Sequence, residues 1–306
     1  TLYSFSTAIQ ISESEDLNIL RNRISGNFGG TLISLTNIDG GNLGNLVANN
    51  FIQGVFQNTA SPRILYFYPQ TTGSGVRDEL QFAHNTMDVR LGQTGLTNTT
   101  GLFYVLASGN VVSSFVFANN LLHFDTAATR SISTGTNIFY LSNTPFLDSS
   151  LFNHNQYYTP QSGVNLGIVG SNGIAYNSLN SWSSALGIDS QSFWLNAQLS
   201  QGRYPVPTVG LLNNAGISLP SVNEDYLGNP RSATQPDLGA LEFNTSTTDL
   251  TISRLDSPRA YCGMNQEPVI AWVKNTGSIT VSSFSIGFSV NGGTPVTQNQ
   301  TAFLNP

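Results

Sequence analysis

A short pattern of apolar and polar residues recurs along the first half of the chain. Each copy is anchored by an asparagine, and consecutive anchors are 28, 35, 35 and 35 residues apart. The anchors are Asn22, Asn50, Asn85, Asn120 and Asn155. Apolar residues stand three before each anchor (Ile19, Val47, Phe82, Phe117, Phe152) and two after it (Ile24, Ile52, Met87, Leu122, Tyr157). The alternation within a copy predicts short strands, and its recurrence predicts parallel strands stacked coil upon coil around one core.

The asparagine column indicates a bend between strands. A tight bend needs a residue that tolerates left-handed backbone angles, and asparagine does so better than any residue except glycine. Stacked asparagine side chains can also hydrogen-bond to each other and to backbone groups freed at the bend. We therefore expect the five anchors to form a structural ladder rather than a ligand site.

The anchored coils resemble the right-handed parallel β-helix of the pectate-lyase-like superfamily, over about residues 1–243. The segment Asp225–Phe243 resembles the closing segment of secreted bacterial β-helix proteins. The match includes Asp225, Gly228, Arg231, Asp237 and Glu242. The resemblance implies an all-β fold in which about residues 174–243 cap the open end of the helix, where strand edges would otherwise be exposed. We expect Arg231 to pair with Asp237 or Glu242.

A second, shorter region follows a polar linker at residues 244–249. Residues 250–306 alternate as strands do, and Asn291–Gly293 carries a hairpin-turn signal. This region resembles an immunoglobulin-like β-sandwich. Such a module needs about 100 residues, so we expect it to be incomplete and the chain to continue into other domains. Cys262 is expected to be a small buried residue or the partner of a cysteine beyond Pro306.

Composition excludes several classes of function. Only 9% of residues are charged, the net charge is −6, and Lys+Arg number 11, so no phosphate-binding footprint is expected and nucleic acid is excluded as a partner. No apolar run approaches the length of a membrane span, so membrane insertion is not expected. The single cysteine excludes cysteine-based zinc sites, and the three histidines lack metal-ligand spacing. We therefore expect neither a metal nor a cofactor.

One candidate site follows from the 35-residue period. Asp88 and His123 stand three residues after their anchors, and Arg90 and Asp125 stand five after. These four residues should be neighbours on an outward face. They form either a patch that binds or cleaves a sugar or cross-strand pairs that only stabilise the sheet. His84 and His154, one residue before their anchors, are expected to face solvent or to support the ladder.

These observations favour a non-enzymatic extracellular segment of a large bacterial surface or secreted protein. It would act in adhesion or as a rigid glycan-binding spacer. Its partners would be a polysaccharide or a host or environmental surface glycan, together with other domains of the same chain. Two alternatives remain open: a polysaccharide lyase or glycoside hydrolase that acts on the helix face, and a phage or injection-system fibre.

Overall fold

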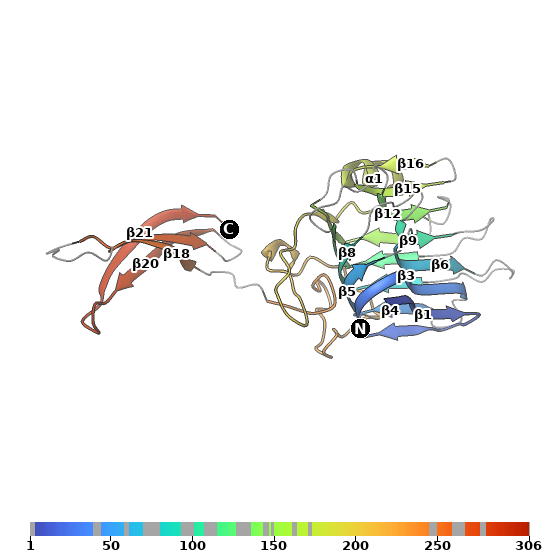
Figure 1. Cartoon of the computed structure of the whole chain (residues 1–306), viewed down its shortest axis with the longest axis horizontal. Coiled ribbons are helices and arrows are strands. Elements are labelled where there is room, and N and C mark those ends of the chain that lie inside the picture. Colours follow the sequence, from blue (N-terminus) through green and yellow to red (C-terminus); the bar gives the residue numbers. More distant parts are fainter. Residues whose placement is uncertain are drawn as a thin grey trace. The chain divides into compact units, whose positions relative to one another are not determined.

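The chain is an all-β protein in the computed structural model (Figure 1). It divides into two compact units, Thr1–Val206 with Asn214–Phe243, and Pro207–Asn213 with Asn244–Pro306. The structure describes residues 4–38, 44–57, 61–69, 80–92, 101–106, 115–126, 136–142, 147, 150–160, 164–170, 173–244, 250–258, 267–275 and 280–305.

Three rows of strands, paired mainly in parallel, build the first unit. The first row is β5 (Phe51–Phe56), β8 (Thr86–Leu91), β11 (Leu121–Thr126), β14 (Gln156–Tyr158) and β17 (Phe193–Trp194). The second is β6 (Arg63–Pro69), β9 (Gly101–Val105), β12 (Thr136–Leu141), β15 (Val164–Val169) and the antiparallel β16 (Ile174–Tyr176). The third is β2 (Asn18–Leu20), β4 (Asn45–Ala48), β7 (Leu80–Ala83), β10 (Phe115–Ala118) and β13 (Leu151–Asn153).

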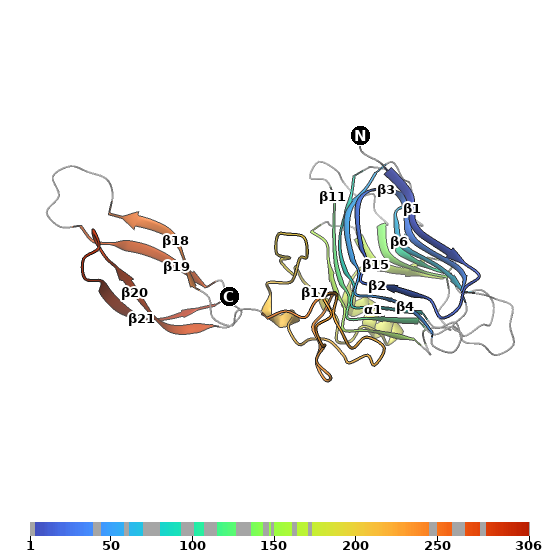
Figure 2. The same ribbon diagram turned by 90° about the horizontal axis from the view of Figure 1, so that it is seen from below.

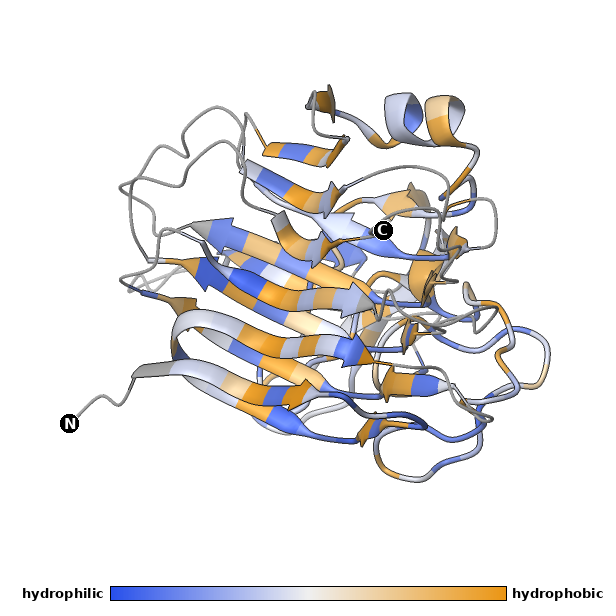
Figure 3. Cartoon of the chain, turned by 90° about the vertical axis from the view of Figure 1, so that its right-hand side faces the viewer, coloured by the Kyte–Doolittle hydropathy of each residue, from blue (hydrophilic) through white to orange (hydrophobic). Residues whose placement is uncertain are grey.

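The first two rows form one curled sheet, because the long strand β3 (Arg23–Ile38) pairs with β5 along its first part and with β6 along its second. Strand β1 (Ser4–Ser12) lies on the other side of β3. Figure 2 shows these strands curling around the interior. Hydrophobic and hydrophilic residues alternate along them, as Figure 3 shows.

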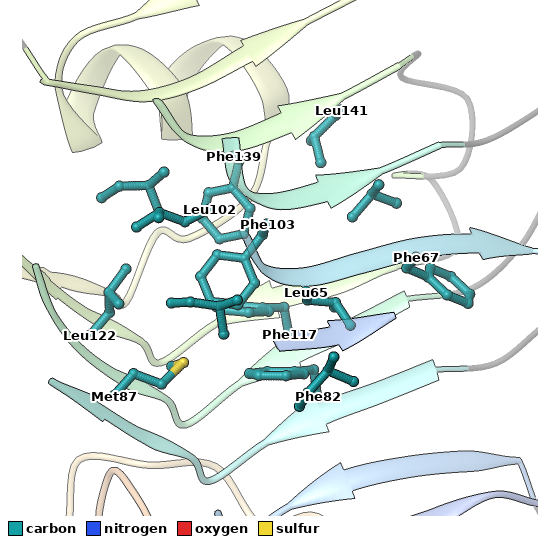
Figure 4. Close-up of a cluster of buried hydrophobic side chains, with 14 of the residues drawn as sticks. Leu65, Phe67, Phe82, Met87, Leu102, Phe103, Phe117, Leu122, Phe139 and Leu141 are labelled. Carbon is teal, nitrogen blue, oxygen red and sulfur yellow. The ribbon is translucent and has the colours of Figure 1, made fainter. Parts of the chain in front are cut away.

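The interior is a stack of side chains that are about 35 residues apart in the sequence. In the third row, Phe82 pairs with Phe117 and Phe117 with Phe152. Figure 4 shows the rings of Phe82 and Phe117 one above the other, and their centroids lie 5.4 Å apart. The centroids of Phe117 and Phe152 lie 5.7 Å apart. All three side chains are buried. The predicted internal phenylalanine stack is therefore confirmed.

The anchoring asparagines are hydrogen-bonded from coil to coil. The backbone N–H and the side-chain Nδ2 of Asn85 both donate to Oδ1 of Asn120, over 3.0 and 3.1 Å. Asn85 Nδ2 also donates to the carbonyl of Val47, over 3.0 Å. The same arrangement joins Asn50 to Asn85 and Asn120 to Asn155. Each buried amide thus satisfies backbone groups that the bend leaves without strand partners.

The left-handed backbone lies one residue earlier than expected, which corrects the sequence-based interpretation of the bend. The residues with φ between 52° and 59° at the bends are Arg21, Asn49, His84, Asn119 and His154, not the anchors. We call these five residues the bend column. A single left-handed residue turns the chain and leaves the anchor that follows with its amide directed into the coil.

One end of the interior is covered by the helix α1 (Leu179–Leu186), which begins at the N-cap Ser178 and ends at Gly187, where φ is 71°. Its buried Trp182 stacks on Phe139, with ring centroids 5.6 Å apart. Gly167 permits this approach, because a Cβ there would lie 2.3 Å from the indole ring. Trp182 therefore extends the aromatic stack beyond the last complete coil.

Within the expected cap at about residues 174–243, α1 covers one end of the interior, whereas residues 214–243, which we call the strap, contact the side of the coils. They run across the coils along the bend column. His154 Nδ1 lies 2.8 Å from the carbonyl oxygen of Ala215, and Asn49 Nδ2 donates to the carbonyl of Glu224 over 2.7 Å. Glu224 also pairs with Arg21. Polar side chains of the bend column therefore bind the strap, whereas α1 covers the apolar end.

Buried polar contacts hold the strap in its own shape. Arg231 pairs with Glu242, with Nη1 and Oε1 2.7 Å apart, and Nη2 donates to Asn49 Oδ1 over 2.7 Å. Asp225 accepts hydrogen bonds from the backbone of Leu227 and Asn229, which closes the turn at Gly228. Burial lowers the pKa of Arg231, and Glu242 opposes that shift. Of the two expected partners, Glu242 is the one whose carboxylate binds Arg231.

The second unit consists of two antiparallel pairs: β18 (Leu250–Ser257) with β19 (Ile270–Asn275), and β20 (Val281–Phe288) with β21 (Val296–Leu304). Asn275 Nδ2 donates to the carbonyl of Leu304 and joins them. The unit also includes the 3₁₀ turn η2 (Gly210–Leu212). An apolar cleft of about 580 Å³ lies between the pairs. Cys262 and linker residues 245–249 lie outside the described residues.

Candidate functional site

A polar pocket lies on the outer side of the first row of strands. Its floor is Gln53 from β5, Asp88 and Arg90 from β8, and His123 from β11. These side chains point outward because their strand neighbours, such as Met87, Val89 and Leu122, are buried in the core. The pocket has a volume of about 260 Å³.

The strand register brings the floor residues together. Asp88 is the cross-strand partner of both Gln53 and His123, and His123 is the partner of Tyr158. His123 Nδ1 lies 3.1 Å from Asp88 Oδ1, and the rings of His123 and Tyr158 have centroids 5.3 Å apart. Both members of the Asp88–His123 pair remain about a quarter exposed, at 28% and 23%. The pair is therefore accessible to a ligand.

Arg90 and Asp125 are also cross-strand partners, as the 35-residue spacing predicts. Arg90 lines the pocket, whereas Asp125 is not among the described residues that line it. Arg90 is exposed and makes no hydrogen bond or ion pair within the described part of the chain. Its guanidinium is therefore a free cation at the pocket. The predicted quartet thus contributes three residues to the pocket and one beside it.

A wall that the sequence did not reveal encloses the other side of the pocket. Residues between Asn196 and Pro205 form it, in the segment that the resemblance places in the expected cap. Ser200 and Val206 exchange hydrogen bonds of 2.8 and 3.0 Å, which close this segment into a loop. Arg23 holds the loop against the strands, because its Nε donates to the carbonyl of Arg203 and its Nη2 to Gln53 Oε1.

His84 lies under the strap rather than at the pocket. It is fully buried, so of the two expectations, exposure to solvent and support of the ladder, the first is wrong. Its Nε2 lies 2.8 Å from Nδ2 of Asn119, and the Asn119 amide is oriented by two hydrogen bonds to the backbone of Ile217. That orientation makes His84 Nε2 an acceptor. Burial lowers the pKa of His84 well below its usual value, and the charge of Arg231 lowers it further.

A second buried group, Asp189, ends the asparagine ladder. Its carboxylate accepts hydrogen bonds from Trp182 Nε1 over 2.9 Å, from the Tyr157 hydroxyl over 3.2 Å and from Asn155 Nδ2 over 3.2 Å. Burial raises the pKa of Asp189, and these hydrogen bonds oppose the shift. The donors surround the carboxylate and it is inaccessible to solvent. Asp189 is therefore a structural terminus of the ladder.

Neither a metal-binding cluster nor a membrane-spanning helix is found in the described part of the chain. It contains no group of three or more histidine, cysteine, aspartate or glutamate residues placed to hold a metal ion. None of its helices has the length and apolar character that a membrane span requires. Asp88 and His123 together supply two potential ligands, fewer than a zinc site uses.

Comparisons with protein-family models, with curated proteins and with solved structures each gave no match. The geometry of the site therefore carries the functional argument: an aspartate beside a histidine, an arginine without a partner among the described residues, and several amides around a small polar pocket.

Proposed function

We propose that the first unit is a right-handed parallel β-helix and the second an immunoglobulin-like sandwich, in a non-enzymatic extracellular segment of a large bacterial surface or secreted protein. The recurring coils, the resemblance of Asp225–Phe243 to closing segments of secreted β-helix proteins, and the paired strands after residue 249 support this proposal. The segment would act in adhesion or as a rigid glycan-binding spacer.

The pocket on the first row would be the binding site for a saccharide. The observation that carries this proposal is its lining, which is almost entirely polar and combines amides, a carboxylate, a histidine and an arginine. Sugar hydroxyls both donate and accept hydrogen bonds, and Gln53, Asp88 and Asn196 offer matching groups. The strands that carry the floor are fixed by the core, so the polar groups are preorganised for binding.

Binding is favoured over hydrolysis by the number of carboxylates. Glycoside hydrolysis ordinarily uses two, about 5–5.5 Å or 6.5–9.5 Å apart on opposite sides of the bond. Asp88 is the only carboxylate among the described residues that line the pocket, and it is bound to His123. This arrangement supports recognition better than acid–base cleavage.

A glycan panel tests this proposal. The full chain should bind at least one saccharide, and Gln53→Ala should weaken that binding about 5-fold or more, because one hydrogen-bonding amide is lost. Gln10→Ala is the matched control, since Gln10 is an exposed glutamine on β1, outside the pocket lining. Equal loss in both variants, or no binding to any saccharide, would refute the site.

Enzymatic cleavage remains the second candidate because the Asp88–His123 pair has the form of a histidine oriented by a carboxylate. A lyase or hydrolase would release shorter products from a polysaccharide. Product formation that is lost in both His123→Ala and Asp125→Asn would replace the binding proposal with this one. Undegraded polymer in the presence of measurable binding would support recognition alone.

A further inference from the structure

We infer that the pocket recognises a single saccharide unit, at a chain end or a branch, that carries an anionic group, and that Arg90 binds the anion. This inference rests on the proposed saccharide binding and specifies which ligand the pocket selects. It is carried by three features of the site: the size of the pocket, the wall that encloses it and the free charge of Arg90.

The pocket is too small for several sugar units. Its volume is about 260 Å³, below the range of roughly 300–1,000 Å³ that holds drug-sized ligands. A single sugar ring is smaller than such ligands and suits this space. A polymer that lay along the strand face would need an open groove instead.

The loop that forms the wall limits how far a longer ligand can extend. It covers the side of the pocket opposite Asp88 and His123, and the Arg23 contacts to Arg203 and Gln53 bind it to the strands. Leu199 and Pro205 give this wall a small apolar surface for the C–H face of a ring. A terminal or branching unit can enter such a site, whereas the middle of a linear chain would meet the wall.

The charge at the pocket favours an anionic ligand. Asp88 Oδ1 lies 3.1 Å from His123 Nδ1, whereas Arg90 makes no hydrogen bond or ion pair within the described residues. Two further arginines, Arg23 and Arg203, stand at the wall. In a chain of net charge −6, three arginines thus stand at or beside the pocket, and the described lining itself contains one arginine and one carboxylate.

The shape of the guanidinium specifies the anion further. Its planar fork of N–H donors matches a carboxylate or a sulfate, whose oxygens accept two hydrogen bonds together. A ligand anion would fill the donors of Arg90, while Gln53 and Asn196 would bind ring hydroxyls. A uronic acid and a sulfated sugar supply this chemistry equally.

Calorimetric titration of the full chain tests the inference with three probes: a uronic-acid monosaccharide, a sulfated monosaccharide and the neutral parent sugar. At least one anionic probe should bind about 10-fold more tightly than the neutral one, because it gains one charged hydrogen-bonded contact with Arg90. Added salt should weaken the binding of the anionic probe, because the ion pair between the anion and Arg90 would be exposed to solvent. Whichever anionic probe binds identifies the source of the anion.

Two variants isolate the role of Arg90. Arg90→Gln should remove the preference for the anionic sugar, and Arg90→Lys should retain part of it. Arg63→Gln is the matched control, because Arg63 is an arginine of the second row that stacks over Tyr104, and it should leave the preference unchanged. Thermal unfolding of each variant shows that the fold is kept.

A series of anionic oligosaccharides tests recognition of a single unit. Affinity per chain end should stay constant with length. Affinity that rises steadily with length would overturn the single-unit inference. Neutral sugars that bind as tightly as anionic ones, unchanged by Arg90→Gln, would overturn the role of Arg90 while leaving saccharide binding intact. Absence of binding to every sugar would refute the proposed function as well.

Discussion

The two units use the same alternating pattern of residues but bury it to very different degrees. In the first unit, Phe82 and Phe117 are fully buried. In the second, Ile252 is 56% exposed and Trp272 is 55% exposed, although both lie on strands. Each inner strand of the coiled unit has a strand above it, one below it and two further rows across the core. The described residues of the second unit form two-stranded sheets.

An alternating pattern of residues in the sequence does not by itself determine whether the apolar side chains are buried. Alternation predicts which side chains share a face, but a two-stranded sheet has too few neighbours to cover that face. In the coiled unit, the strands of successive coils and of the other rows cover the apolar face. We therefore expect stability to be concentrated in the first unit, and the following variants test this expectation from the largest effect to the smallest.

Removal of one ring from the phenylalanine stack should have the largest effect. Phe117→Ala should lower the free energy of unfolding of the first unit by about 3–5 kcal/mol, because it leaves a cavity in a packed core. The matched variant is Phe303→Ala in the second unit, where the ring is 79% exposed. It should change stability by less than about 0.5 kcal/mol. Denaturant unfolding measures both, and equal effects would contradict the contrast between the units.

Loss of the buried arginine should detach the strap. Arg231→Ala leaves the carboxylate of Glu242 without its paired cation and removes the hydrogen bonds to Asn49 Oδ1 and the carbonyl of Gly239, so the first unit should lose about 3 kcal/mol. Arg254→Ala in the second unit removes an arginine whose side chain is 60% exposed and paired with Asp256. It should cost about 0.5 kcal/mol. Unchanged melting of Arg231→Ala would refute the structural role of the strap contacts.

Loss of one asparagine from the ladder should lower stability more than loss of a single buried asparagine in the second unit. Asn85→Leu deprives the backbone N–H of Asn50 and the carbonyl of Val47 of their partners, at a cost of about 2–3 kcal/mol. Asn275→Leu in the second unit removes the hydrogen bond to Leu304 and should cost about 1 kcal/mol. Hydrogen exchange of each unit measures the difference. A larger loss for Asn275→Leu would reverse the comparison.

A lower pH should reduce the stability of the first unit, because His84 is buried in the folded chain. Its pKa in the folded chain is below the usual 6.5, so the unfolded chain binds more protons and stability falls as the pH drops below about 6.5. At pH 5 this contribution reaches at most about 2 kcal/mol. His84→Gln should remove that loss, as measured by unfolding at pH 7 and pH 5. All three histidines precede residue 207, so histidine titration should leave the second unit unaffected.

Asp237 acts in the opposite direction. Burial raises its pKa to about 6 from a usual 3.8, so the folded chain binds more protons between these values and becomes more stable as the pH falls through them. Asp237→Asn should therefore steepen the loss of stability between pH 6 and pH 4. A shallower pH dependence in Asp237→Asn would contradict the assignment.

The sequence predicts the positions of the repeated strands, because a pattern that recurs at a fixed spacing shows which residues of successive strands are neighbours. The spacing of 35 residues placed Phe82 beside Phe117 and Asp88 beside His123, as the strands do. The strap and the wall of the pocket occur once, so no register located them. Their positions depend on contacts with the bend column and with Arg23, which are distant in sequence. The left-handed residue precedes each anchor asparagine because the anchor's amide is directed into the coil, where it hydrogen-bonds to the neighbouring anchor.

Paired cysteine substitutions test the coiled register most directly. In a Cys262→Ser background, Gln53→Cys with Asp88→Cys joins positions that are 35 residues apart and cross-strand partners. A short bifunctional thiol reagent should link this pair rapidly. The control pair, Tyr66→Cys with Asp88→Cys, is closer in sequence but lies on two different rows, and it should remain unlinked. Rapid linking of the control pair, or none at Gln53 and Asp88, would contradict the coiled architecture and the pocket built on it.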